Sequence, residues 1–66
     1  MTITLNGEDR EEEPDISVLA LLESLGVAPA RVAVELNGDV LRRVDFGRRT
    51  LRDGDQVEFV QFVGGG

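Results

Sequence analysis

The stretch ISVLALLESLG, residues 16–26, predicts one amphipathic helix. Ser17 is suited to the N-cap, because its hydroxyl can accept a hydrogen bond from a free N–H group of the first turn. Gly26 is suited to the left-handed residue that ends a helix, and Pro29 prevents continuation. The apolar residues follow the spacing i, i+3, i+4 and i+7, at Val18, Leu21, Leu22 and Leu25. This apolar stripe requires a second apolar layer to pack against.

The residues before the helix predict a β-hairpin. Residues 1–5 read MTITL, in which polar and apolar residues alternate as in a strand with one buried face. Asn6 and Gly7 are a strong signal for a two-residue hairpin turn. Residues 8–13 are nearly all charged, so we expect a weak edge strand whose charge blocks unwanted pairing and which ends at Pro14.

A second hairpin and a final strand follow the helix. Residues 31–36 alternate in the same way, and Asn37 and Gly38 repeat the turn signal before a short strand at residues 40–43. Residues 57–63 are the most β-prone segment of the chain and predict the last strand.

The segment between these last two strands is less regular. Residues 44–51 predict a loop or a turn of 3₁₀ helix, with Phe46 and Leu51 as apolar anchors. Residues 53–55 read DGD and predict a turn. The further ligand residues of a calcium-binding loop do not occur at the required spacing around this turn, so we do not expect a metal site there.

The order hairpin, helix, hairpin, strand predicts an α+β fold with a mixed four- to five-stranded sheet packed on one main helix. We expect the first and last strands to run parallel at the centre of the sheet, which is the β-grasp or ubiquitin-like arrangement. Residues 1–63 then form a single domain, and residues 64–66 form a flexible C-terminal glycine tail. We expect the sheet face toward the helix to bury Ile3, Leu5, Val32, Val34, Leu36, Val57 and Phe59.

The composition excludes most catalytic chemistry. The 66 residues contain no cysteine, no histidine and no lysine, since all seven basic residues are arginines. A thiolate nucleophile, an imidazole base or ligand and a Schiff-base amine are therefore absent. The remaining candidates are charge clusters, for which we favour a solvated surface over a site; they are Glu8, Asp9, Glu11, Glu12 and Glu13, with the pairs Arg42-Arg43 and Arg48-Arg49. We expect no enzyme activity, no bound metal and no bound cofactor.

The net charge of −6 narrows the class of partner. A negative protein repels a phosphate backbone, so we expect no nucleic-acid partner. The longest apolar run, residues 18–22, is much shorter than the ~20 residues that a membrane span needs. The first residues lack the features of a signal peptide, and we expect a cytoplasmic protein without a membrane partner.

The tail Gly64, Gly65 and Gly66 is the most informative feature for function. By itself a glycine end is commonly a frayed terminus or a cloning scar. Here it directly follows the last strand, and three glycines reach roughly 10 Å without side chains. Such a tail can enter a narrow channel and present the α-carboxylate of Gly66. An ionised carboxylate is a poor electrophile, so a partner has to activate it, for example as an acyl-adenylate.

Four segments carry a family resemblance. They are the helix segment VLALLESLG (residues 18–26), the strand VAVELNG (32–38), the turn DGD (53–55) and the ending QFVGGG (61–66). With the β-grasp pattern, these segments resemble the ThiS family of sulfur carriers in thiamine biosynthesis, and the resemblance covers essentially the whole chain. The small subunit of molybdopterin synthase and ubiquitin-like modifiers share the Gly-Gly end. The molybdopterin relative usually has prolines just before its tail, whereas none follows Pro29 here.

The resemblance implies a carrier cycle in which this chain is a co-substrate. An E1-like adenylyltransferase adenylates the carboxylate of Gly66 with ATP, and a sulfur donor protein converts it to a thiocarboxylate. Thiazole synthase then takes the sulfur, and the carrier returns as a carboxylate. Gly64 and Gly65 give the tail its reach and clearance.

Alternation along the last strand predicts a docking surface beside the tail. If Val57 and Phe59 face the helix, then Val60 and Phe62 face outward, beside Thr2, Thr4 and Ala33. We assign Val60, Phe62 and Val63 to partner binding, because an exposed apolar group beside a tail suits recognition. Three functions stay open at this point: the sulfur carrier of thiamine or molybdopterin synthesis, a protein modifier that forms isopeptide bonds with target lysines, and an interaction module with an incidental tail.

Overall fold

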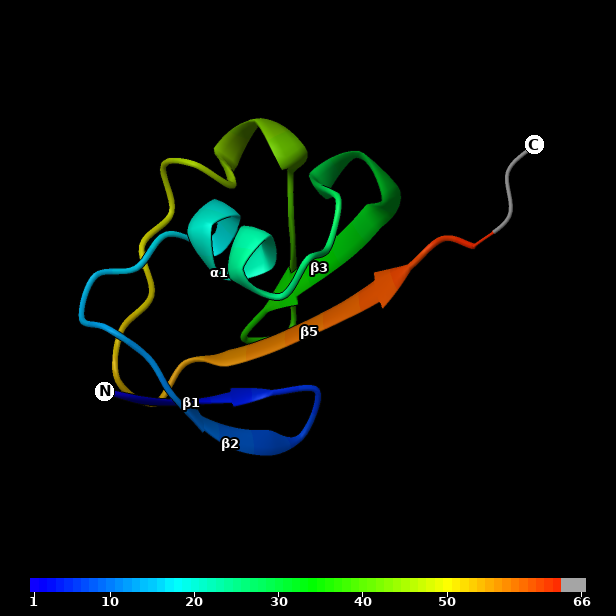
Figure 1. Ribbon diagram of the computed structural model, residues 1–66. Coiled ribbons are helices and arrows are strands. Elements are labelled where there is room, and N and C mark those ends of the chain that lie inside the picture. Colours follow the sequence, from blue (N-terminus) through cyan, green and yellow to red (C-terminus); the bar gives the residue numbers. More distant parts are fainter. Residues whose placement is uncertain (64–66) are drawn as a thin grey trace.

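The computed structural model describes residues 1–63, and in them a five-stranded mixed sheet packs on the helix α1 (Val18–Ser24) (Figure 1). The strand order is β2-β1-β5-β3-β4. The strands are β1 (Thr2–Leu5), β2 (Glu8–Glu11), β3 (Val32–Leu36), β4 (Asp39–Leu41) and β5 (Gln56–Gln61), and two 3₁₀ turns are η1 (Pro29–Arg31) and η2 (Arg43–Asp45). The α+β architecture with one main helix is therefore confirmed.

The helix has the caps and the buried stripe that the sequence predicts. The Ser17 hydroxyl accepts a hydrogen bond from the backbone N–H of Ala20 at 3.0 Å. Gly26 closes the other end with a φ of +74°, a conformation that costs glycine little. Three residues of the stripe are completely buried and the fourth, Leu25, is half-buried against them; the buried three are Val18, Leu21 and Leu22.

Both Asn-Gly pairs make the predicted hairpin turns. Asn6 and Gly7 have φ values of +50° and +84°, and Asn37 and Gly38 have values of +53° and +87°. Two consecutive positive φ values define the turn whose twist matches that of the strands on either side. The turns of the two hairpins are therefore encoded by local sequence.

The centre of the sheet is the parallel pair of the first and last strands, as predicted. In its register Thr4 lies beside Gln56 and Leu5 beside Val57. On its other side β5 pairs antiparallel with β3 along its whole length, from Val57 opposite Leu36 to Gln61 opposite Val32. The inner face of this sheet and α1 enclose the core, which consists of Ile3, Val18, Leu21, Leu22, Val27, Val32, Val34, Leu36, Phe46, Leu51 and Val57.

The segment after β4 anchors the helix, as expected from Phe46 and Leu51. Their side chains are 2% and 0% exposed. The backbone N–H of Leu51 donates to the carbonyl of Ile16 at 2.8 Å, and the N–H of Val18 donates to the carbonyl of Arg49 at 2.9 Å. These bonds fix the start of α1 against the segment that covers it.

The strand ends differ from the prediction. The second strand ends at Glu11 instead of Glu13, and the fourth covers Asp39–Leu41 instead of residues 40–43. Arg31 belongs to the turn η1, because Pro29 starts a 3₁₀ turn there, so β3 begins only at Val32.

That late start of β3 also shortens the last strand. β5 ends at Gln61, opposite the first residue of β3, instead of at residue 63. The N–H of Phe62 still donates to the carbonyl of Arg31 at 2.8 Å, and no strand lies beyond it within residues 1–63. Phe62 and Val63 therefore follow the strand instead of belonging to it.

Two residues expected in the core are only half-buried. They are Leu5 and Phe59, which pack on the edge of the core. Both lie where β1 ends: Leu5 is its last residue, and Phe59 has a strand neighbour only in β3, opposite Val34. Within residues 1–63, no helix is both long and apolar enough to cross a membrane.

The cap of α1 gives a testable prediction. Replacing Ser17 with Ala removes the only side-chain acceptor observed for the first turn of a helix of seven residues, and we expect a loss of about 1 kcal/mol in the free energy of unfolding. Ser17→Thr keeps the hydroxyl and serves as the matched control. Urea unfolding followed by circular dichroism measures both variants, and equal stability of Ser17→Ala and the wild type would contradict the assignment.

Candidate functional site

The candidate site is the end of β5 together with the residues that follow it. Here the chain presents three exposed apolar side chains: Val60 is 65% exposed, Phe62 is 60% exposed and Val63 is 96% exposed. The tail residues Gly64, Gly65 and Gly66 lie outside the described residues. The structure thus places the three predicted partner-binding residues on the last part of the chain before the tail, and it leaves their role as a prediction.

The register corrects the neighbours predicted for Val60. Ala33 lies directly opposite Val60 in the antiparallel pair of β3 and β5, and both residues are exposed. Thr4, however, lies beside Gln56, four residues before Val60, so the expected proximity of Val60 to Thr2 and Thr4 is wrong. The error arises because the parallel strand β1 covers only the first part of β5.

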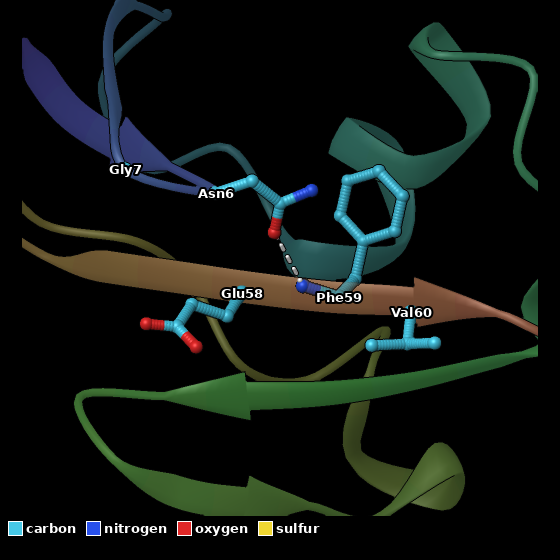
Figure 2. A pocket seen from close by; sticks show the side chains of 5 residues that line it. All are labelled: Asn6, Gly7, Glu58, Phe59 and Val60. Carbon is cyan, nitrogen blue, oxygen red and sulfur yellow. Dashed lines mark hydrogen bonds between the residues drawn. The ribbon is translucent and has the colours of Figure 1, made fainter.

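A shallow hollow opens where β1 ends beside β5 (Figure 2). It has a volume of about 380 Å³ and is lined by Asn6, Gly7, Glu58, Phe59 and Val60. In Figure 2 the Phe59 ring lies on the side of β5 nearer α1, whereas Glu58 and Val60 lie on the opposite side. The hollow is therefore open to a partner that approaches along the end of the sheet, next to the residues that lead into the tail.

Asn6 has a second role that sequence reasoning missed. Its side-chain carbonyl Oδ1 accepts a hydrogen bond from the backbone N–H of Phe59 at 2.8 Å (Figure 2). A turn residue thereby supplies the bond that a longer β1 would have supplied. The pair Asn6-Gly7 signals a turn in the sequence, but the bond depends on the offset between β1 and β5, which the sequence does not encode locally.

The turn at residues 53–55 uses its carboxylates within the fold. Asp53 accepts a hydrogen bond from the N–H of Thr2 at 2.7 Å, and Asp55 accepts one from the N–H of Arg52 at 2.8 Å. The side-chain amide of Asn37 donates to the other oxygen of Asp55 at 3.1 Å. The prediction of a turn is confirmed, and within the described residues 1–63 no three acidic side chains are grouped so as to hold a metal ion.

The charge clusters lie near the edges of the sheet. All four residues of the acidic strand β2 are exposed at one edge of the sheet. Arg48 and Arg49 line a second hollow of about 260 Å³ with Leu41 and Asp45, near the opposite edge. Neither cluster includes Val60, Phe62 or Val63, although Glu8 directly follows Gly7, which lines the hollow beside Val60.

Comparison with known proteins defines the family. A model of the ThiS family matches residues 3–66. The chain belongs to the ThiS family. The match runs through the end of β5 and includes Gly64, Gly65 and Gly66.

Two curated relatives show how the ThiS-like sequence occurs in other proteins. A sulfur carrier protein ThiS from Thermus thermophilus is 41% identical over 64 residues, which cover 97% of this chain and 98% of the relative. A thiazole synthase from Magnetococcus marinus is 46% identical over all 66 residues. The chain spans only about a fifth, 20%, of the length of that enzyme.

A solved structure agrees with the fold. The crystal structure of a thiamine biosynthesis protein (ThiS) from Geobacter metallireducens is 46% identical, with a TM-score of 0.84 and complete coverage, 100%, of both chains. This likeness confirms the β-grasp prediction. The resemblance to the ThiS family drawn from residues 18–26, 32–38, 53–55 and 61–66 is confirmed as well.

The bond from Phe59 to Asn6 can be tested in solution. Asn6→Gly tolerates the positive φ of the turn but lacks the acceptor, so we expect the amide hydrogen of Phe59 to exchange with solvent about tenfold faster. Asn6→Asp keeps a carboxylate acceptor and is the matched control. Residue-resolved hydrogen exchange by NMR provides the measurement; unchanged exchange at Phe59 in Asn6→Gly would show that the bond does not persist.

Proposed function

We propose that this protein is the sulfur carrier of thiamine biosynthesis and that the α-carboxylate of Gly66 is its reacting group. The observation that carries the proposal is the match to the ThiS family over residues 3–66, which includes the glycine tail. The relative from Thermus thermophilus that bears the name of this function covers almost the same span, at 97% of the chain and 98% of the relative. The family match favours this function over a molybdopterin carrier or a protein modifier.

The proposed chemistry begins with activation by a partner. An E1-like adenylyltransferase transfers the AMP part of ATP to a carboxylate oxygen of Gly66 and releases pyrophosphate. A sulfur donor protein then supplies sulfur to the acyl carbon, AMP leaves, and a thiocarboxylate remains. The ionised carboxylate requires this step, because its negative charge makes the carbonyl carbon a poor electrophile.

The carrier has no evident means to carry out that activation by itself. Its 66 residues hold no cysteine, histidine or lysine, and no glycine-rich phosphate-binding loop is visible in the sequence. ATP is therefore bound by the partner in this proposal, and the carrier acts as a co-substrate instead of a catalyst. Its expected location in the cytoplasm stays a prediction.

Thiazole synthase is the proposed acceptor of the sulfur. The thiazole synthase from Magnetococcus marinus contains a segment that matches all 66 residues of this chain at 46% identity. Joining two modules in one chain raises their effective concentration, which benefits modules that act on each other. That arrangement supports a direct encounter between the present carrier and a separate thiazole synthase.

Val60, Phe62 and Val63 form the proposed docking surface for these partners. Each is at least 60% exposed, so none contributes substantially to the core. They follow one another into the tail, and a partner that binds them also determines where the tail enters. Exposed apolar side chains at such a place suit the anchors of a protein interface.

The role of Gly66 is tested by mass spectrometry. We expect the wild-type chain, incubated with the adenylyltransferase, ATP and a sulfur donor, to gain the mass difference between one sulfur and one oxygen atom. Deletion of Gly66 is expected to abolish the gain without changing the unfolding midpoint, because the buried core of the described residues 1–63 runs from Ile3 to Val57. A full mass gain in the deletion variant would refute the proposed reacting group.

The docking surface has a matched control on another strand. We expect Phe62→Ala and Val60→Ala to weaken binding to the adenylyltransferase about tenfold each, with little change in stability. Val40→Ala removes the same side chain as Val60→Ala at a residue that is 77% exposed on the edge strand β4, and it is expected to bind normally. Isothermal titration calorimetry compares the three variants, and equal losses in Val40→Ala and Val60→Ala would speak against a localised surface.

A further inference from the structure

Along one edge of β5, the backbone N–H and C=O groups form hydrogen bonds with β3 and the residues next to it. The N–H of Phe62 donates to the carbonyl of Arg31, and the carbonyl of Gln56 accepts from the N–H of Asn37. In an antiparallel pair the bonded residues alternate, so the even-numbered residues of β5 direct their backbone groups to β3. The odd-numbered residues, which include Phe59 and Gln61, direct theirs to the opposite edge.

That opposite edge is only partly occupied. β1 pairs with Gln56 and Val57 and then ends, and the carbonyl of Val57 accepts from the N–H of Asn6 at 2.9 Å. The Asn6 side chain satisfies the N–H of Phe59. Beyond this bond the carbonyl of Phe59 and both backbone groups of Gln61 have no hydrogen-bond partner among residues 1–63.

The other free edges of the sheet are protected against pairing, whereas this one is not. The edge strand β2 consists entirely of charged residues, with the sequence EDRE, and the edge strand β4 has only three residues. Charge and short length are the usual ways in which a protein blocks strand addition. The free part of β5 carries no charged side chain between Phe59 and Gln61, and it borders the hollow of about 380 Å³.

We propose that an extended segment of the adenylyltransferase that activates the tail adds to this edge as a short strand beside residues 59–61. The identity of the binding enzyme rests on the proposed function. The location of the added strand rests on the hydrogen-bonding pattern of β5. Strand addition uses main-chain hydrogen bonds, and here three free backbone groups lie next to one another. The end of the β1–β2 hairpin limits the added strand to a few residues.

The chemistry of the hollow specifies the segment further. Glu58 is the only charged residue that lines it, and the whole chain has a net charge of −6. A segment with a basic side chain near Glu58 and an apolar side chain against Val60 or Phe59 therefore fits best. Because residue 61 is separated from the tail by only Phe62 and Val63, pairing at this edge fixes the direction in which the tail leaves the domain.

Hydrogen exchange of the wild-type protein provides the first test. The ¹⁵N-labelled carrier is mixed with a saturating amount of the unlabelled adenylyltransferase without ATP. We expect the amide of Gln61 to exchange fast in the free carrier and at least about tenfold more slowly in the complex. The amide of Glu58, which already bonds to β3, is the internal reference and is expected to change little.

Three outcomes of this test would overturn the inference. Unchanged exchange at Gln61 in a saturated complex excludes strand addition by this enzyme. Protection of Gln61 that increases with the concentration of the carrier alone assigns the edge to a second copy of the chain. Equal slowing of every amide reports overall stabilisation instead of a bond at this edge.

A backbone variant provides the second test. Gln61→Pro removes the outward N–H but leaves the bond from Phe62 to Arg31 in place, while Gln61→Ala keeps the N–H and is the matched control. We expect Gln61→Pro to raise the KM for the carrier in adenylation about tenfold and Gln61→Ala to leave it unchanged. Equal KM values for two folded variants would overturn the inference.

The two proposals fail in different ways in these experiments. If the wild-type carrier gains no sulfur with the complete set of partners, the proposed function is wrong. The assignment of the enzyme that pairs with β5 is then wrong as well. If the wild type gains sulfur normally while Gln61 shows no protection, the function stands and strand addition is wrong. The exchange experiment needs no variant, so misfolding of Gln61→Pro does not prevent a decision.

Discussion

The offset between the two central strands determines how this domain presents its functional end. β1 and β5 pair in parallel at only two positions, Thr4 with Gln56 and Leu5 with Val57. Parallel strands need a long connection, and here the connection contains the helix and the second hairpin. Because β1 ends early, β5 continues beyond it with support from β3 on one side (Figure 1). The hollow, the half-buried Phe59 and the exposed residues before the tail all follow from this offset.

The residues that stabilise the fold consequently differ from those proposed to bind partners. The core consists of apolar side chains from α1, the inner face of the sheet and the segment after β4, and these are at most 8% exposed. Val60, Phe62 and Val63 are exposed and lie outside this core. A domain of 66 residues without cysteine, and hence without disulfides, needs nearly all of its apolar stripe for folding. Substitutions at the exposed residues Val60, Phe62 and Val63 are therefore expected to have little effect on the folded state.

The features that the sequence predicted correctly are those encoded by neighbouring residues. The Asn-Gly turns, the cap at Ser17 and the stripe of α1 each depend on a few adjacent positions. The strand ends were predicted poorly, because they depend on distant residues. β5 ends opposite the first residue of β3, and β3 begins only after the 3₁₀ turn that starts at Pro29. The bond from Phe59 to Asn6 joins residues 53 positions apart. Such features require the register between distant strands, which no local pattern supplies.

The composition also suits a chain that carries an activated carbonyl. An acyl-adenylate reacts with amines and thiols, and these 66 residues contain neither lysine nor cysteine. Serine and threonine hydroxyls are weak nucleophiles without an adjacent base, and the chain has no histidine. The remaining amine, that of Met1, donates to the carbonyl of Glu12 at 2.9 Å. Since β1 runs parallel to β5, Met1 lies toward the start of β5, at the opposite end of that strand from Gln61 (Figure 1). In the carrier role proposed above, the chain thus offers few groups of its own that would react with an activated Gly66 before a partner does.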